Sequence, residues 1–259
     1  MPAVLLEKKE TLATITLNRP QTLNSFDEAM VDEALDILEA VEKDQDVRVV
    51  VLTGSGKAFC AGGDLAYIRE HLTDAASVHR FMTKVGALSK KLRHLRQPTL
   101  AMVNGAAAGA GANLALACDI IICTPSCRFG QSFAKVGLIP DAGGFYYLPR
   151  AVGLAKAKEL MFTGALINAE TALSLGLVNR VVEYDRLRQE TYQLAAEIAS
   201  GPPLALAMTK RGLNLSLDSS FDDMMALEIA GQSVALLTED SREGLAAFVE
   251  RRSPRFIGA

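Results

Sequence analysis

The sequence predicts an α/β fold in which a mostly parallel, buried sheet is covered by helices. Short apolar runs of strand length alternate with longer segments of helical periodicity. Some of the short runs are apolar at every position, as expected for strands covered on both faces of a parallel sheet. The last part of the chain has helical patterns only. We therefore expect an α/β core spanning residues 1–195 and a helical C-terminal region spanning residues 196–259.

The first elements are a strand and a helix. Ala13, Ile15 and Leu17 alternate with threonines, which indicates a half-buried strand. Residues 25–28 read Ser-Phe-Asp-Glu, a capping-box pattern that predicts a helix beginning at Ser25. The apolar stripe of this helix comprises Phe26, Met30, Leu35, Leu38 and Val41.

The remaining strands are expected at short apolar runs. They are Val49–Leu52, Thr99–Val103, Ile120–Cys123, a short strand beginning at Arg128 and Phe129, and Leu177–Val182. Three amphipathic segments follow, one beginning at Pro202 and Pro203, one at Phe221–Leu237 and one at Arg242–Arg252. A helical unit of this size cannot bury its own apolar faces, so we expect it to pack against the core or another subunit.

Composition excludes several classes of protein. The chain has 259 residues, 49% of them hydrophobic and 22% charged, as in an ordinary globular protein. The net charge of -3 shows no basic excess, so we expect no nucleic-acid partner. The most apolar stretch, Ala106–Cys118, is too short to span a bilayer, and the N-terminus lacks the apolar core of a signal peptide. We therefore expect a cytoplasmic protein, or a mature organellar enzyme, without a membrane partner.

The cysteines and histidines do not form a metal-binding pattern. The four cysteines fit neither a disulfide scaffold nor a zinc site. The three histidines lie in one charged, helix-like region, where solvent-exposed positions are expected. We therefore predict no metal site and no histidine-based catalytic triad.

Three glycine-rich segments follow strand-like runs and precede helix-like runs. They cover residues 54–65, 104–113 and 137–144. Neither a phosphate-binding P-loop nor a dinucleotide fingerprint is complete in them, because Val51 and Leu114 occupy required glycine positions. Small residues at helix N-termini expose backbone N–H groups, and two such loops could form an oxyanion hole. Alternatively, the small residues only allow helices to pack closely on strands.

These segments resemble the signature loops of the crotonase superfamily, the enoyl-CoA hydratases and isomerases. The resemblance covers residues 58–65, 104–120 and 129–144, with Asn18-Arg19-Pro20 near the N-terminus and Glu243-Gly244 in the last helix. It implies a crotonase (ClpP-like) spiral of ββα units whose C-terminal helices form homotrimers, often paired into hexamers. It also implies an acyl-CoA thioester as the substrate, with coenzyme A as part of that substrate and no separate cofactor.

The resemblance also implies a set of site residues. The backbone N–H groups of Gly63 and Ala110 would hold the thioester oxygen while an enolate develops. Ala61, Asp64 and Leu65 in the first loop would contact the coenzyme A portion. The coenzyme A phosphates need cationic groups, for which Arg19, Lys57, Arg251, Arg252 and Arg255 are the candidates.

The sequence departs from the family's hydratases at their two catalytic glutamates. Asn113 and Phe133 occupy these positions, and neither can act as a general acid or base. Asp141 supplies a carboxylate in the third loop, in a context closest to the ring-1,2-epoxyphenylacetyl-CoA isomerases, although a turn or N-cap role would also suit it. Asn113 is a candidate for a substrate or water hydrogen bond.

The favoured function is an enoyl-CoA isomerase in which Asp141 moves a proton and thereby shifts a double bond. Apolar neighbours such as Phe133, Ile139 and Phe145 are expected to raise the pKa of Asp141. The alternatives are a weak or specialised hydratase, a non-catalytic acyl-CoA-binding relative, and an enzyme in which Asp141 is a nucleophile. Tyr67, Phe145, Tyr146 and Tyr147 are candidates for contact with a medium-chain or aromatic acyl group.

Overall fold

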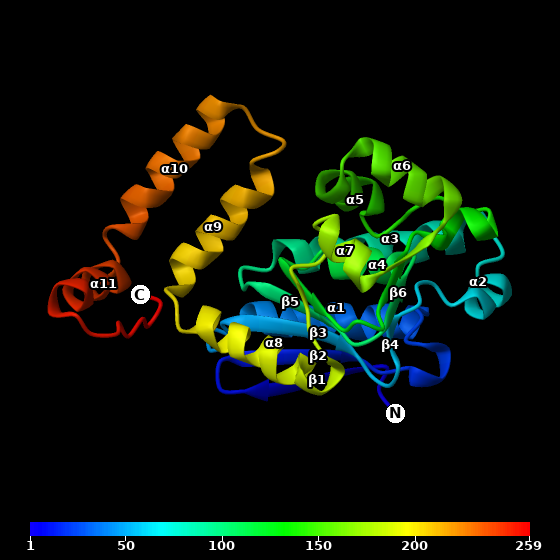
Figure 1. The fold of residues 1–259 in the computed structure, drawn as a ribbon, viewed down its shortest axis with the longest axis horizontal. Coiled ribbons are helices and arrows are strands. Elements are labelled where there is room, and N and C mark those ends of the chain that lie inside the picture. The colour runs from blue at the N-terminus through cyan, green and yellow to red at the C-terminus, as the bar shows by residue number, and fades with distance from the viewer.

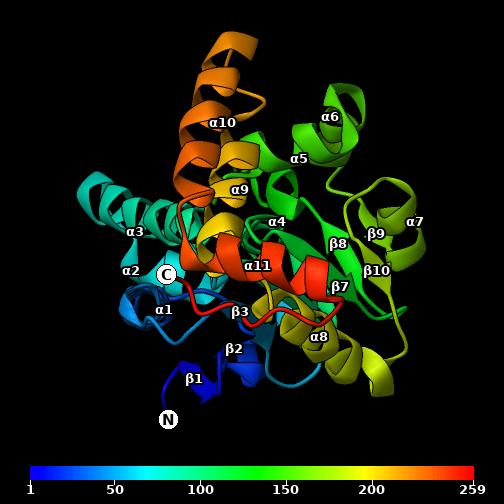
Figure 2. The same ribbon diagram turned by 90° about the vertical axis from the view of Figure 1, so that its left-hand side faces the viewer.

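The structure is a computed structural model that describes all 259 residues (Figure 1). It consists of an α/β body and a helical arm; α10 of the arm stands clear of the body in Figure 1, and its upper end projects beyond the body in Figure 2. The strands are β1 Val4–Lys9, β2 Leu12–Leu17, β3 Val49–Gly54, β4 Ala58–Cys60, β5 Thr99–Val103, β6 Ala106–Ala108, β7 Ile120–Cys123, β8 Arg128–Gly130, β9 Leu166–Asn168 and β10 Arg180–Val181. The helices are α1 Glu28–Lys43, α2 Leu65–His71, α3 Ala75–His94, α4 Ala110–Leu116, α5 Gly144–Val152, α6 Leu154–Thr163, α7 Ala169–Ser174, α8 Tyr184–Ala199, α9 Pro203–Leu215, α10 Phe221–Ala235 and α11 Glu239–Glu250.

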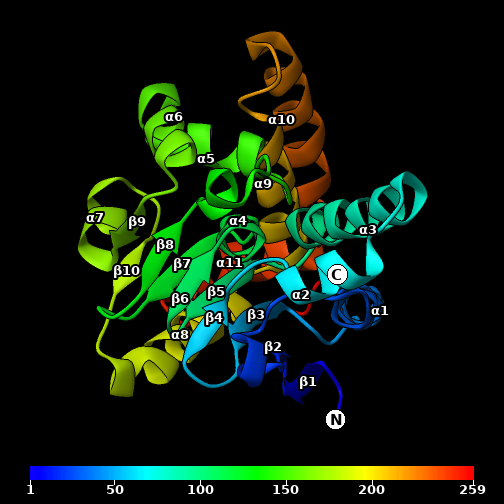
Figure 3. The ribbon, with the colours of Figure 1, turned by 90° about the vertical axis from the view of Figure 1, so that its right-hand side faces the viewer.

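The strands form two sheets, and successive parts of the chain add a strand to each of them. The six-stranded sheet has the order β1-β2-β3-β5-β7-β10 and is parallel except for the β1–β2 hairpin. The four-stranded sheet has the order β4-β6-β8-β9 (Figure 3). The pairs β3–β4, β5–β6 and β7–β8 each give one strand to each sheet before the chain continues into helices. The body is therefore the predicted spiral of ββα units.

The central strands are apolar because helices cover both of their faces. In β3, Val49 and Val51 pack toward α8, which contributes Leu187 and Ala195 to a small cluster on that side. Val50 and Leu52 face the larger core, to which α1 and α3 contribute. The predicted strands Thr99–Val103 and Ile120–Cys123 are confirmed with the same bounds.

The capping box predicted at Ser25 is wrong. The N-cap of α1 is Asp27, whose carboxylate accepts a 2.9 Å hydrogen bond from the Met30 N–H, while the Ser25 hydroxyl donates to the Thr22 carbonyl. The helix cannot begin earlier because Phe26 forms a parallel β-bridge with Gly63. Tertiary pairing thus overrides the local pattern.

Several strands were not predicted or are shorter than predicted. The last strand is limited to Arg180–Val181 and does not span Leu177–Val182. At Asn179 the Ile121 N–H donates to the Asn179 side chain and not to a main-chain carbonyl, and the regular pairing with β7 begins at Arg180. The sequence analysis did not predict the strands β1, β4, β6 and β9. Of these, β4 and β6 lie in alanine- and glycine-rich segments without β-branched residues.

The arm begins after α8, which continues through residue 195 to Ala199. The helices α9, α10 and α11 follow, and the last residues fold back on α11, where Asp240 accepts hydrogen bonds from the Ile257 and Gly258 N–H groups. Arg48 of the body bonds the carbonyls of Ala199 and Phe256 and so ties this end to the sheet. No helix combines the length and apolarity that crossing a membrane requires.

Candidate active site

Three loops at the ends of successive ββα units come together beside α4. A side chain added at Gly62 would come within 3.3 Å of the Ala110 nitrogen, so the first two loops are in close contact. The side chain of Asn113, on α4, donates a 2.8 Å hydrogen bond to the Asp141 carbonyl of the third loop. The structure therefore brings the loops of Gly63, Ala110 and Asp141 to one place.

The N–H group of Gly63 is oriented by a β-bridge. The Phe26 N–H donates to the Gly62 carbonyl at 2.7 Å, and the Asp64 N–H donates to the Phe26 carbonyl at 2.9 Å. Successive N–H groups of an extended chain point to opposite sides, so the Gly63 N–H points away from Phe26. Gly62 has φ +97°, which only glycine adopts without strain.

The N–H group of Ala110 lies at the N-terminus of α4. Ala110 is the first residue of this helix, so its N–H has no partner within the helix and the helix dipole adds positive character. The helix packs closely on β4, since a side chain at Gly111 would clash with the Cys60 carbonyl at 2.3 Å. This close packing explains why the segment contains glycine there and brings the Ala110 loop beside the Gly62–Gly63 loop.

The third loop turns sharply just after Asp141. The Gly144 N–H donates to the Asp141 carbonyl at 2.8 Å, and Ala142 has φ +46°, a strained value for a residue with a side chain. The Ser89 hydroxyl, on α3, holds the Ala142 carbonyl at 2.8 Å. The bonds from Asn113 and Ser89 thus fix the strained turn from two different helices.

Asp141 is half-buried, and one of its two carboxyl oxygens has no hydrogen-bond partner. Its Oδ1 atom is shielded from solvent and makes no hydrogen bond, and burial raises the pKa of Asp141 from 3.8 to about 6. The direction agrees with the sequence expectation. Two of the expected neighbours do not provide the cover, because Ile139 is 73% and Phe145 59% exposed.

No carboxylate stands at the two positions where the sequence departs from the hydratase pattern. Asn113 is fully buried, and both polar atoms of its side-chain amide are hydrogen-bonded. Its Nδ2 donates to the Asp141 carbonyl, and its Oδ1 accepts a 2.7 Å hydrogen bond from the Gln131 side chain. Phe133 is also buried, and a side chain at Gly109 would touch its ring at 3.6 Å. The contact of Asn113 with a substrate stays a prediction, because the bonds that it makes in this structure are internal.

The residues predicted to contact coenzyme A occupy different environments. Asp64 caps α2 by accepting hydrogen bonds from Ala66 and Tyr67, and Leu65 is exposed at the start of that helix. Ala61 is half-buried, and Lys57 is exposed on the loop between β3 and β4 without an ion pair. Arg19 is paired with carboxylates of the body.

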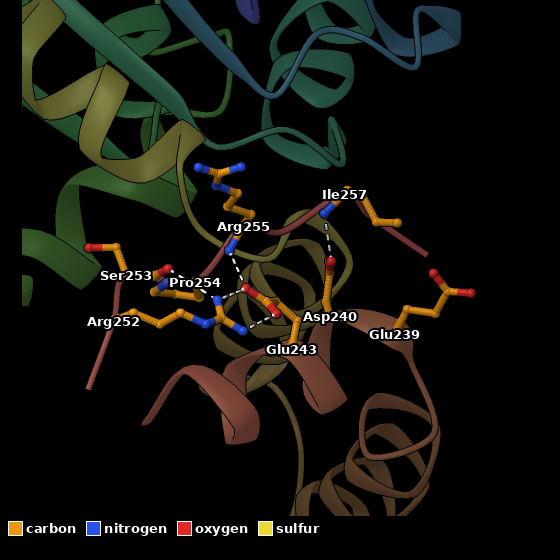
Figure 4. A pocket seen from close by; sticks show the side chains of 8 residues that line it. All are labelled: Glu239, Asp240, Glu243, Arg252, Ser253, Pro254, Arg255 and Ile257. Atoms are coloured by element: carbon orange, nitrogen blue, oxygen red, sulfur yellow. Dashed lines mark hydrogen bonds and ion pairs between the residues drawn. The ribbon is translucent and has the colours of Figure 1, made fainter. Parts of the chain in front are cut away.

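Two of the three C-terminal arginines, Arg252 and Arg255, line a separate pocket between α11 and the chain end (Figure 4). Arg252 pairs with Glu243 and Glu250, so its charge is neutralised within the arm. The main-chain N–H of Arg255 donates to Glu243, while its guanidinium points away from α11. This pocket lies on a different part of the chain from the three glycine loops.

Most of the aromatic candidates have contacts outside the three loops. The Tyr67 hydroxyl donates to Glu28, and its ring stacks on His71. Tyr146 donates to Asp218 of the segment after α9, and Tyr147 is buried beside the Ser89 hydroxyl. Contact of these rings with an acyl group stays a prediction.

Two residues that hold the site were not found from the sequence. Ser89 and Gln131 act only through long-range hydrogen bonds, to Ala142 and Asn113 respectively. Ser89 lies on the buried stripe of α3, and a polar residue on an apolar helix face is the one signal that could have pointed to it.

Comparison with known proteins identifies the family. The family model described as "Enoyl-CoA hydratase/isomerase" matches residues 7–259. The chain is 39% identical to the 1,2-epoxyphenylacetyl-CoA isomerase of Escherichia coli K12, covering 100% of this chain and 99% of that protein. It is 36% identical to the crotonyl-CoA hydratase of Syntrophomonas wolfei, covering 98% and 97%. The crystal structure of an enoyl-CoA hydratase from Bacillus anthracis superposes with a TM-score of 0.95 at 33% identity, covering 99% and 100%.

Proposed function

The chain belongs to the enoyl-CoA hydratase/isomerase family, and we propose that it is an isomerase that shifts a double bond in an acyl-CoA thioester with Asp141 as its acid–base group. The similarity to both a named isomerase and a named hydratase supports an acyl-CoA substrate but leaves the reaction type to the site residues.

The observation that carries the proposal is the half-buried Asp141 carboxyl, whose Oδ1 is shielded from solvent and makes no hydrogen bond. A pKa of about 6 suits a group that must take a proton and return it near neutral pH. Water addition needs a base for the water and an acid for the carbon, and the hydratase positions hold Asn113 and Phe133. An isomerase relocates a single proton, so one carboxylate is sufficient.

The proposed mechanism begins with the thioester oxygen between the N–H groups of Gly63 and Ala110. These donors stabilise the negative charge that develops on the oxygen as a dienolate forms. The ionised Asp141 removes a proton from the α-carbon of a 3-enoyl ester, and the electron pair moves into the conjugated system. The protonated Asp141 then returns the proton to the γ-carbon, which gives the 2-enoyl ester and restores the carboxylate.

A paired assay tests the proposal. The protein and its Asp141→Asn variant each receive a 3-enoyl-CoA and, separately, a 2-enoyl-CoA, and the products are separated by chromatography. We expect conversion of the 3-enoyl to the 2-enoyl ester, lost in the variant by a factor of about 10²–10⁴. Hydration of the 2-enoyl ester that Asp141→Asn leaves undiminished would overturn the proposal and favour a hydratase.

We further propose that residues 196–259 form the oligomerisation region of a homotrimer or hexamer. Large apolar side chains are exposed along the arm: Leu204, Leu213, Leu215, Leu217, Phe221, Met225, Ile229, Val234, Leu236, Leu237, Leu245, Phe248 and Val249. So many exposed large apolar side chains in one region are typical of a protein that buries them in an interface. Sedimentation equilibrium tests the assembly, and a monomer at micromolar concentration would contradict it. The cytoplasmic location stays a prediction.

A further inference from the structure

We propose that Arg19 is a positioning residue for the oxyanion hole and acts by fixing the loop that carries the Gly63 N–H group. The proposal rests on the proposed function, in which this N–H group binds the thioester oxygen. It gives Arg19 a role different from the phosphate contact expected from the sequence.

The guanidinium of Arg19 clamps both sides of the β-bridge that orients Gly63. Its Nη1 donates a 2.5 Å hydrogen bond to the Ser25 carbonyl, and Nη2 lies 3.0 Å from Asp27 and 2.9 Å from Asp64. Ser25 and Asp27 flank Phe26, and Asp64 follows Gly63. One planar side chain therefore joins the two short segments whose pairing sets the direction of the Gly63 N–H.

A second contact supports the same loop from the Arg19 side. The Arg19 N–H donates to Asn24 Oδ1, and the Asn24 Nδ2 donates to the carbonyls of Ala58 and Phe59 in β4, which leads into the Gly62–Gly63 loop. Asn24 is fully buried and has φ +59°, so this turn is held in a strained form. The main chain and the side chain of Arg19 thus brace the two ends of one loop.

The ion pairs and the burial of Arg19 argue against a role of this residue as a ligand of the coenzyme A phosphates. The Arg19 side chain is 17% exposed and the paired Asp64 side chain 13% exposed, and both terminal nitrogens of the guanidinium are engaged. A coenzyme A phosphate would have to displace two carboxylates. Lys57, exposed and without an ion pair, is a better candidate for that contact.

The inference predicts that Arg19 affects turnover more than binding. An oxyanion hole acts on the charge that develops in the transition state, and small displacements of a donor reduce the rate strongly. For Arg19→Met we expect kcat on a 3-enoyl-CoA to fall about 10- to 100-fold, with KM changed less than about threefold. Arg19→Lys keeps the positive charge but not the planar guanidinium with its several donors. We therefore expect kcat of Arg19→Lys to lie between those of Arg19→Met and the unaltered protein.

The experiment combines kinetics with infrared spectroscopy of a bound 2-enoyl-CoA labelled with ¹³C at the thioester carbonyl. The unaltered protein should lower the carbonyl stretching frequency of the bound ester relative to solution, and Arg19→Met should reduce this shift. Arg96→Met serves as a matched control, because Arg96 also bonds main-chain carbonyls, those of Glu42 and Asp44, away from the three loops. The control should leave kcat and the frequency unchanged, and melting temperatures compare the folds of all variants.

The outcomes separate the two proposals. A frequency shift that Arg19→Met leaves intact, or a KM rise of more than about 10-fold at unchanged kcat, overturns the role of Arg19 while the oxyanion hole stands. The absence of any shift in the unaltered protein removes the oxyanion hole, and both proposals with it. If Arg19→Met does not fold, the comparison is made with Arg19→Lys, where full kcat and a full frequency shift contradict the inference.

Discussion

The side-chain amide of Asn113 donates a 2.8 Å hydrogen bond to the main-chain carbonyl of Asp141. The bond joins α4, whose first residue carries one proposed oxyanion N–H group, to the turn that carries the proposed base. Because Asn113 and Ala110 are three residues apart on α4, donor and base are fixed relative to one another by one turn of helix. We therefore predict a positioning role for Asn113, at the place where the hydratase pattern has a glutamate.

Removing this bond should lower both stability and turnover. In Asn113→Ala, the buried Gln131 amide loses its acceptor and the Asp141 carbonyl loses a donor. We expect a loss of about 2 kcal/mol in the free energy of unfolding and about a 10-fold fall in kcat. Urea unfolding and steady-state kinetics measure the two effects.

Asn179→Ala is the matched control for this prediction. The Asn179 side chain also forms a main-chain hydrogen bond, to the Ile121 N–H in the six-stranded sheet, but it lies outside the three loops. It should lose stability and keep kcat. An equal fall of kcat in both variants would mean that Asn113 acts only through general stability.

The local parts of the fold were predictable and the long-range parts were not. Apolar runs located the central strands, because Val49–Leu52 is buried on both faces whatever its partners are. The start of α1 was misplaced because the bridge between Phe26 and Gly63 joins residues 37 positions apart. The positions of Gly63, Ala110 and Asp141 followed from the resemblance to the family. The hydrogen bonds of Ser89 and Arg19 that support these residues depend on tertiary packing, so the sequence could at most mark Ser89 as a polar residue on an apolar helix face and could not give its partner.

The rate of the reaction should depend on the ionisation of Asp141. Burial raises the pKa of this carboxyl to about 6, and only the ionised form can take the substrate proton. We therefore expect kcat to rise with pH through about 6 and to reach a plateau above pH 7. A kcat profile measured from pH 4.5 to 8 tests this. A flat profile would exclude Asp141 as the base.

The stability of the folded protein should also depend on the ionisation of Asp141, but it should fall with rising pH where kcat rises. The pKa of the folded protein, about 6, lies above the ordinary value of 3.8, so between these values the folded state binds more protons than the unfolded state. The contribution of Asp141 to the free energy of unfolding therefore falls as the pH rises from about 4 to 6, and it stays low above pH 6. Asp141→Asn, which carries no charge, should be more stable than the unaltered protein at pH 7.5, by up to about 3 kcal/mol.

The same comparison at pH 4 should show almost no difference, because both side chains are then neutral. Urea unfolding at the two pH values, at one protein concentration, measures the effect. Asp36→Asn, on the exposed face of α1, is the control for a general charge change. A larger stabilisation by Asp141→Asn at pH 4 than at pH 7.5 would contradict the assignment of a desolvated carboxylate.

The Ala110 N–H group can be removed without removing the helix that presents it. Ala110 is the first residue of α4, a position at which proline is tolerated because the N–H has no partner in the helix. In Ala110→Pro we expect kcat to fall by about 10²–10³, the usual effect of losing one oxyanion donor. Ala75→Pro makes the same change at the first position of α3, where the cap bonds use Ala76 and Ser77 instead, and should keep kcat. If Ala110→Pro folds with the unaltered far-ultraviolet circular dichroism spectrum and keeps full kcat, the thioester oxygen does not bind at this N–H group.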